Sequence, residues 1–157
     1  MKALKILNQF SSFKALNQQL EQYTKNQQTK LAGDIFELAV KLYLQTNPKY
    51  RTKLKNVWLL KEVKENIKQK LNLPSEDEGI DLIAETYDKR YWAIQAKYRS
   101  NPKETLTLSG SGGLATFNSL AFSYCKNISH GLICTTVDKP PKKIRLLKSV
   151  GFETLES

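Results

Sequence analysis

Two neighbouring apolar runs, interrupted by polar residues at particular positions, constrain this chain more than any other feature. The runs are residues 78–85 and 91–98, and both alternate with a period of two and are rich in β-forming residues. We therefore predict two adjacent strands. Asp81 in the first run, and Gln95 and Lys97 in the second, stand where apolar residues would otherwise be expected. A carboxylate, an amide oxygen and an ammonium at the ends of adjacent strands suit a divalent cation beside a phosphate.

Strand register decides whether these three side chains share a face of the sheet. Gln95 and Lys97 are two residues apart and therefore lie on the same face. Asp81 joins them only if the residue numbers of each opposed pair add to an even number. The register that pairs Asp81 with Lys97 and Ile83 with Gln95 meets this condition. That register requires a three-residue turn at 88–90, whereas a two-residue turn sends Asp81 to the other face. We predict the longer turn, or a bulge near Asp81.

Composition narrows the class of partner. The 157 residues are 40% hydrophobic, which is enough for one domain with one packed core. The net charge is +10 and the pI is about 9.6, so the surface is predominantly positive. Such a surface suits a polyanion, for which nucleic acid is the usual candidate. A basic charge that only aids solubility is the alternative.

The cysteines and the hydropathy pattern argue against several classes. Cys125 and Cys134 are nine residues apart, with no CxxC pair and no histidine cluster, so neither a zinc site nor a disulfide framework is indicated. We expect two reduced, buried thiols in a cytoplasmic protein. No apolar segment is long enough to span a bilayer, so no membrane partner is expected.

The remaining pattern predicts alternating helices and strands. Apolar spacing of three to four residues predicts helices within 1–24, at 30–46 with Thr29 as its cap, and at 114–126. A basic helix is predicted at 142–150, residues 61–72 are helix-capable, and short strands are predicted at 57–60, 131–136 and 152–155. The predicted buried stripe of the 30–46 helix is Leu31, Ile35, Leu38, Ala39 and Leu42. This order of elements predicts an α/β sandwich with a mixed sheet.

The polar residues of the hairpin carry a family resemblance. Asp81, followed fourteen positions later by Gln95-Ala96-Lys97, resembles the PD-(D/E)XK nuclease signature in the Q-x-K form of Mrr-like restriction nucleases. Gln95 stands where most of that superfamily has Asp or Glu, which removes one negative charge from the site. The resemblance implies a restriction-endonuclease-like α/β/α sandwich with a central mixed sheet. It also implies double-stranded DNA as the substrate and Mg²⁺ as the cofactor, for which Mn²⁺ can substitute.

The resemblance also implies roles for individual residues. Asp81, the Gln95 side-chain oxygen and the Ala96 carbonyl would bind the metal ion, and Lys97 would orient or deprotonate the attacking water. Residues 33–37 match the family's helix motif G-x-x-F-E, which implies that Glu37 helps to position this water.

Other roles stay open at this stage. The residues alone predict a surface ion pair between Glu37 and Lys41. Asp77 or Glu78 is an alternative second metal ligand, although such an acidic cluster is more often a solvated turn. Four residues are candidate nucleic-acid contacts: Arg99 beside the site, Lys53 and Lys55 in a basic loop, and Ser111 in a glycine-rich loop.

The resemblance extends to large restriction enzymes in which one polypeptide joins an Mrr-like nuclease to a superfamily 2 helicase-like translocase and a methyltransferase. It therefore implies that residues 1–157 form a single Mrr-like nuclease domain, with 1–28 as an N-terminal helical extension, at the start of a larger protein. Two alternatives remain. One is a catalytically idle DNA-binding module, which the neutral Gln95 would permit. The other is a repair nuclease that acts on particular DNA structures.

Overall fold

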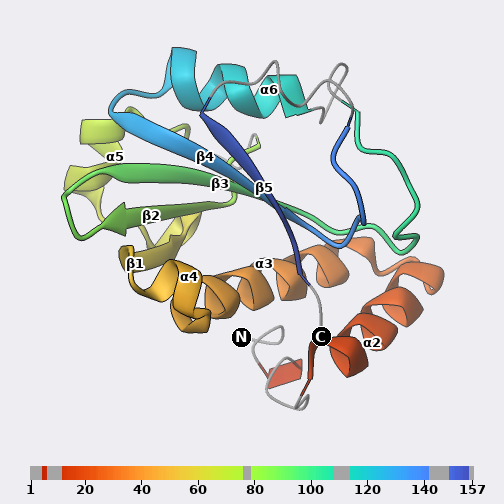
Figure 1. The fold of residues 1–157 in the computed structure, drawn as a ribbon. Coiled ribbons are helices and arrows are strands. Elements are labelled where there is room, and N and C mark those ends of the chain that lie inside the picture. Colours follow the sequence, from red (N-terminus) through yellow and green to blue (C-terminus); the bar gives the residue numbers. More distant parts are fainter. Residues whose placement is uncertain (1–4, 7–11, 76–78, 108–113, 142–148, 156–157) are drawn as a thin grey trace.

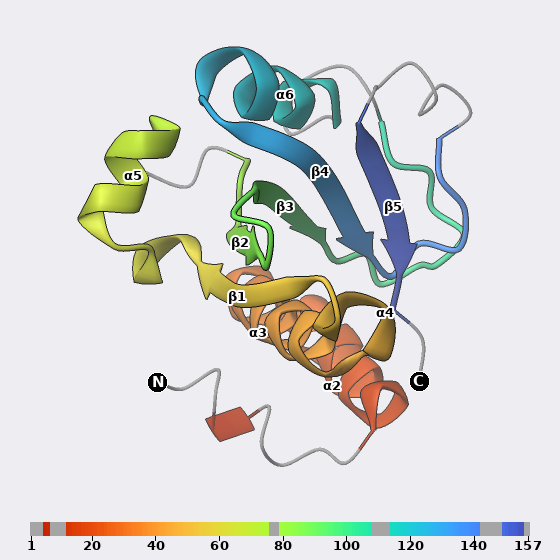
Figure 2. The ribbon, with the colours of Figure 1, turned by 60° about the vertical axis from the view of Figure 1, so that its left-hand side comes forward.

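The computed structural model describes residues 5–6, 12–75, 79–107, 114–141 and 149–155, and it shows one sheet between two helical layers (Figures 1 and 2). The helices are α2 (Phe13–Lys25), α3 (Thr29–Thr46), α4 (Pro48–Arg51), α5 (Glu65–Leu71) and α6 (Leu114–Ser119), with a 3-10 turn η1 (Leu60–Glu62) and a π-helical turn η2 (Leu120–Tyr124). The strands are β1 (Leu54–Leu59), β2 (Leu82–Thr86), β3 (Tyr91–Lys97), β4 (Ile128–Thr135) and β5 (Val150–Thr154).

The sheet is mixed, as the sequence predicts. Its strand order is β1-β2-β3-β4-β5, in which β1, β2 and β3 are antiparallel neighbours while β3, β4 and β5 run parallel. Helix α6 lies in the connection from β3 to β4 and covers one face, and α3, with α2 outside it, covers the other (Figure 2). The predicted α/β sandwich is therefore confirmed. The predicted helix at 142–150 falls largely outside the described residues.

The β2–β3 hairpin has the predicted three-residue turn, but its position is shifted. Leu82 pairs with Ile94 and Ile83 with Ala93, so the predicted pairing of Ile83 with Gln95 is wrong by two residues. The turn is residues 87–89 rather than 88–90, and Lys89 adopts φ +65° within it. Because the shift is even, it leaves the side chains within β2 and β3 on their predicted faces. The common face of Gln95 and Lys97 therefore does not depend on the error.

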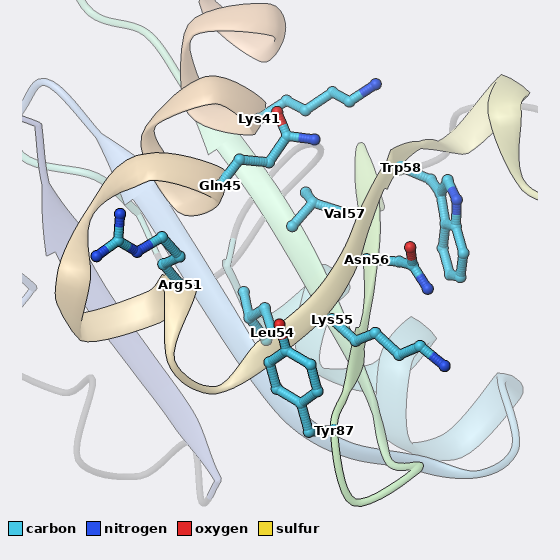
Figure 3. Close-up of a pocket in the computed structure, with 9 residues that line it drawn as sticks. All are labelled: Lys41, Gln45, Arg51, Leu54, Lys55, Asn56, Val57, Trp58 and Tyr87. Atoms are coloured by element: carbon cyan, nitrogen blue, oxygen red, sulfur yellow. The ribbon is translucent and has the colours of Figure 1, made fainter.

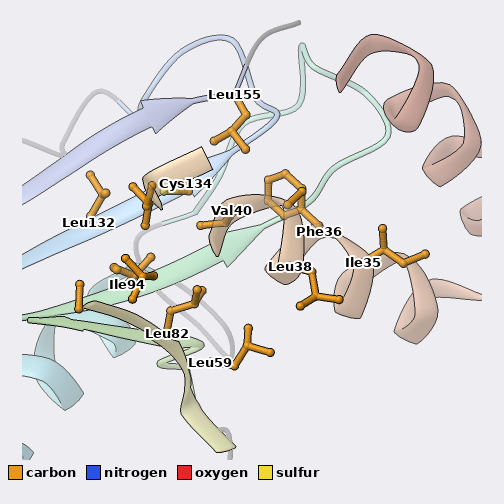
Figure 4. Packing of buried hydrophobic residues seen from close by; sticks show 14 of the residues in the cluster. Ile35, Phe36, Leu38, Val40, Leu59, Leu82, Ile94, Leu132, Cys134 and Leu155 are labelled. Carbon is orange, nitrogen blue, oxygen red and sulfur yellow. The ribbon is translucent and has the colours of Figure 1, made fainter. Parts of the chain in front are cut away.

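Helix α3 is buried on a wider face than its predicted stripe. Ile35, Phe36, Val40 and Leu44 are each at most 1% exposed and pack against even-numbered residues of the central strands (Figure 4). Each aliphatic side chain buried in this way contributes roughly 1.5–3 kcal/mol. The helix is enclosed between α2 and the sheet, which explains why sides not on the predicted stripe are buried.

Two details of the α3 prediction are wrong. Leu42 is 43% exposed, so it is not part of the buried face of the helix. The helix is preceded by Gln28, whose side chain makes no capping hydrogen bond, so Thr29 is the first helical residue and not the cap. Packing of the apolar faces therefore fixes this helix more than its N-terminal chemistry does.

The opposite face of the sheet carries odd-numbered residues of the central strands β2, β3 and β4. Ile83, Ala93 and Ile133 are fully buried there against Phe117 of α6. The predicted helix at 114–126 is α-helical only to Ser119 and continues as η2, a widened turn of the kind that often borders functional sites. Both cysteines are buried and free, as predicted, and burial raises the pKa of the Cys125 thiol to about 11.

Candidate active site

Asp81 lies where β2 begins, and its carboxylate is fixed against β3. The Asp81 amide donates a hydrogen bond of 2.9 Å to the Ile94 carbonyl, and Leu82 is also paired with Ile94. Two residues of one strand therefore oppose one residue of the next, as at a β-bulge. Asp81 Oδ2 accepts a hydrogen bond of 2.8 Å from the Ala96 amide. The carboxylate is thus placed at the residue between Gln95 and Lys97.

Gln95 is the most unusual residue of the site. It is only 4% exposed, and its Oε1 atom is buried without a hydrogen-bond partner among the described residues. Its neighbour on β4 is the fully buried Ile133. A buried acceptor without a partner costs about 1–3 kcal/mol, so folding alone does not explain an amide here. An atom of this kind is suited to a ligand that brings positive charge.

Gly79 shapes the approach of the chain to Asp81. Its φ is +128°, a conformation that residues with a Cβ atom rarely adopt. A Cβ added to Gly79 would lie 3.8 Å from Gln95 Nε2 and 3.9 Å from Leu120 of η2, so space is not limiting. The glycine is therefore required by backbone geometry, which brings the chain over Gln95 and into β2.

Lys97 and Arg99 follow at the end of β3. Lys97 is half-buried, pairs with Thr135 of β4 and shares its face with Gln95, two residues earlier. Arg99 Nε lies 3.1 Å from Glu104 Oε1, so this guanidinium already has an anionic partner. Thr136 both donates to the Arg99 carbonyl at 2.8 Å and accepts from the Arg99 amide at 2.9 Å. Sequence reasoning did not identify Thr136, because a threonine after a strand carries no distinctive signal.

Glu37 is half-buried on α3, next to Phe36, whose ring packs against Tyr98 with the centroids 5.9 Å apart. This places the Glu37 turn of α3 near the end of β3 that carries Lys97. Lys41 Nζ forms an ion pair of 2.8 Å with Glu62 of η1. Sequence reasoning missed that pairing, since 21 residues separate the two.

The other predicted contacts are dispersed. Lys55 lies at the outer edge of β1, while the charge of Lys53 acts on His130, whose pKa is lowered by burial first and by Lys53 second. Ser111 and the alternative ligands Asp77 and Glu78 lie outside the described residues.

The donor set fits a hard divalent cation. Among the described residues, no group of three His, Cys, Asp or Glu side chains could hold a metal ion. The candidate oxygen donors are the Asp81 carboxylate, held at the Ala96 amide, and Gln95 Oε1, which is buried with no hydrogen-bond partner among the described residues. Oxygen donors of this kind suit Mg²⁺ or Mn²⁺ rather than a softer metal.

The sheet is covered by helices on both faces, and Asp81, Gln95 and Lys97 lie at one end of β2 and β3, as the sequence resemblance to nucleases implies. The comparison with known families agrees. Residues 45–146 match the Mrr catalytic family, described as restriction endonuclease, and the chain belongs to this family. The chain is accordingly a nuclease domain of the kind found in restriction enzymes.

A solved structure supports this assignment. The chain is similar, with a TM-score of 0.56 and 29% identity over 78% of its length, to the ATP-dependent Type ISP restriction-modification enzyme LlaBIII bound to DNA. The match covers 7% of that enzyme's chain. The comparison with curated proteins found no match. No helix in the described part of the chain has the length and apolar character to cross a membrane.

Proposed function

We propose that this domain hydrolyses phosphodiester bonds of double-stranded DNA with the help of a divalent metal ion, Mg²⁺ or Mn²⁺, held at the end of β2 and β3. The observation that carries the proposal is the pairing of two features. The Asp81 carboxylate is anchored at the Ala96 amide, and the neighbouring Gln95 Oε1 is buried without a partner among the described residues. A carboxylate held at Ala96 and a partnerless oxygen on the preceding residue are suited to share a cation.

Asp81, Gln95 and the Ala96 carbonyl would hold the metal ion. When bound, such an ion lowers the pKa of water and offsets negative charge on the phosphate. The hydrogen bond from the Ala96 amide fixes one carboxylate oxygen of Asp81 beside the end of β3. Burial of Gln95 keeps bulk water away from its oxygen, which strengthens an electrostatic contact there.

Lys97 and Glu37 would act on the water and on the phosphate. The Lys97 ammonium, two residues beyond Gln95 on the same face, orients or deprotonates water and stabilises the charge that develops on the phosphate. Glu37 would help to position this water from α3. Arg99, Lys53, Lys55 and Ser111 are proposed contacts to the DNA backbone, and Arg99 would exchange its Glu104 partner for a phosphate.

Replacement of Lys97 by alanine tests the chemistry. We expect Mg²⁺- or Mn²⁺-dependent cleavage of plasmid DNA to fall at least about a hundredfold in Lys97→Ala, because a charge aimed at the transition state is removed. Lys14→Ala, on the exposed side of α2, is the matched control and should cut at the normal rate. An unchanged rate in Lys97→Ala would show that Lys97 has no part in the chemistry.

A second candidate is an idle nuclease fold that only binds DNA. The observation in its favour is Gln95, which is neutral where most of the superfamily has a carboxylate. Binding of DNA in EDTA, with no cleavage in either Mg²⁺ or Mn²⁺, would support this candidate against the first.

We further propose that the domain works in the cytoplasm with helicase-like and methyltransferase domains of the same polypeptide. The similarity to a Type ISP restriction-modification enzyme, of which the match covers 7%, supports this arrangement. The mass of the native protein, detected with an antibody against this domain, tests it. A native product of about 18 kDa would contradict the proposal.

A further inference from the structure

A groove of about 450 Å³ lies along the outer edge of β1, and its lining contains none of the proposed catalytic residues (Figure 3). Strand β1 is at the edge of the sheet and is paired only with β2. Lys41 and Gln45 of α3 and Arg51 of α4 form one side of the groove, while Lys55 and Asn56 of β1 form the other. A pocket of this volume is in the range that holds small ligands, and it is open to longer ones.

The charge around the groove is positive. Its lining contains Lys41, Arg51 and Lys55, and none of the described residues that line it is acidic. Two carboxylates contact lining residues and are already bound: Glu62 pairs with Lys41 at 2.8 Å, and Glu85 accepts a hydrogen bond of 2.9 Å from Asn56. Arg51 and Lys55 are exposed and form no ion pair with a described residue. An anionic occupant would meet two available cations.

A β-bulge aims Lys55 at the groove. Leu54 pairs with Thr86 and Asn56 pairs with Glu85, so two steps along β1 oppose one step along β2, and Lys55 is the extra residue. Bulges of this kind re-aim a side chain. Lys53, two residues earlier, has its electrostatic effect on His130 instead. Lysine on an edge strand can also serve only to prevent aggregation, and the experiment below separates the two roles.

An exposed aromatic residue completes the groove. Tyr87 is 63% exposed at the start of the hairpin turn, and its amide is held by the Lys53 carbonyl at 3.1 Å. A fixed but solvent-facing aromatic ring among cations is a common contact for the sugars and bases of nucleic acids. The combination favours a nucleic-acid backbone over an acidic polypeptide, which would not use the ring in this way.

We propose that this groove is a second DNA anchor, which binds backbone phosphates away from the scissile bond through Arg51 and Lys55. Leu60, five residues beyond Lys55, donates to the Asp81 carbonyl at 3.0 Å. Five residues of strand span about 17 Å. Each strand of a duplex carries one phosphate per about 3.4 Å of the helix axis, so this length corresponds to about five phosphates. The anchor therefore contacts DNA roughly five base pairs from the site of cleavage. This inference rests on the proposal that DNA is the substrate.

Salt dependence of binding tests the anchor. Affinity for a fluorescent duplex of about 30 base pairs is measured by anisotropy in EDTA over a range of salt concentrations. The slope of log K against log salt is negative, and each lost phosphate contact reduces its magnitude by about 0.9. The Arg51→Gln/Lys55→Gln variant should therefore reduce the magnitude by about 1.8. The matched control is Lys14→Gln/Lys25→Gln on α2, which removes the same charge and should leave the slope unchanged.

Two results would overturn the anchor. An unchanged slope in Arg51→Gln/Lys55→Gln would show that the groove does not hold DNA, and an equal fall in the α2 control would show an effect of net charge alone. If the groove variant instead loses binding of a polyglutamate peptide while keeping its DNA slope, the occupant is an acidic polypeptide. Because the assay contains EDTA, its outcome is independent of cleavage, and a failure of the nuclease proposal would be seen separately in the Lys97 experiment.

Discussion

Replacement of Gln95 by methionine should stabilise the folded protein while it abolishes cleavage. Most core substitutions destabilise, so this expectation has the opposite sign to the usual one. Gln95 is 4% exposed, and its Oε1 has no hydrogen-bond partner among the described residues. Methionine has a similar length and no stranded acceptor, and its apolar side chain suits a position paired with the fully buried Ile133.

The magnitude follows from two opposed effects. Removal of a buried, partnerless acceptor recovers about 1–3 kcal/mol, while an imperfect fit of the new side chain costs less than about 1.5 kcal/mol. We expect a net gain of about 1 kcal/mol in the free energy of unfolding. For a domain of this size that corresponds to a rise of about 2–4 °C in Tm.

Thermal unfolding in EDTA, followed by circular dichroism, measures this gain. Gln69→Met, at an exposed position of α5, is the control and should leave Tm within error. The same scan with Mn²⁺ should raise the Tm of the unsubstituted protein but not that of Gln95→Met, because only the former keeps the amide oxygen. A Tm for Gln95→Met that falls by several degrees in EDTA would refute the reasoning, since it would show that the amide is satisfied in the fold.

Two further predictions concern the surroundings of the site. Gly79→Ala should lower the free energy of unfolding by about 1–3 kcal/mol in urea, because its φ of +128° strains a residue with a Cβ atom, and it should also reduce cleavage by displacing Asp81; full stability in urea would contradict this. Burial raises the pKa of Glu62, but hydrogen bonds from Lys41 and the Leu59 amide lower it by a larger amount. The pKa of Glu62 is therefore below its ordinary value. The stability from this depressed pKa is complete above the unfolded pKa of about 4.3 and is lost as the pH falls through the folded pKa. Urea unfolding at pH 7 and pH 3 should therefore show a smaller loss of stability on acidification in Glu62→Gln than in the unsubstituted protein. Equal losses would show that Glu62 does not contribute to the pH dependence of stability.

Local sequence pattern was sufficient for the elements and for the face that carries the site. Alternation of apolar residues identified the β2–β3 hairpin, and the even spacing of Gln95 and Lys97 placed both on one face. These features depend on neighbours along the chain, so they can be read without knowledge of the fold. Even the two-residue error in register preserved the face, because side-chain direction in a strand repeats every second residue.

Features that depend on distant segments required the tertiary structure. The hydrogen bond from Ala96 to the Asp81 carboxylate and the burial of Gln95 between β2 and β4 exist only when these strands pair. The exposure of Leu42 likewise depends on where α2 and the sheet lie around α3.

Local spacing and residue type were enough to predict most of the described elements, the polar residues of the hairpin and the common face of Gln95 and Lys97. The fold was needed to show that Gln95 Oε1 is buried with no partner in the described part of the chain and that Arg51 and Lys55 line one groove at the edge of β1. Burial and convergence are properties of segments far apart in the chain, and the packing of those segments sets them rather than the order of residues within any one of them.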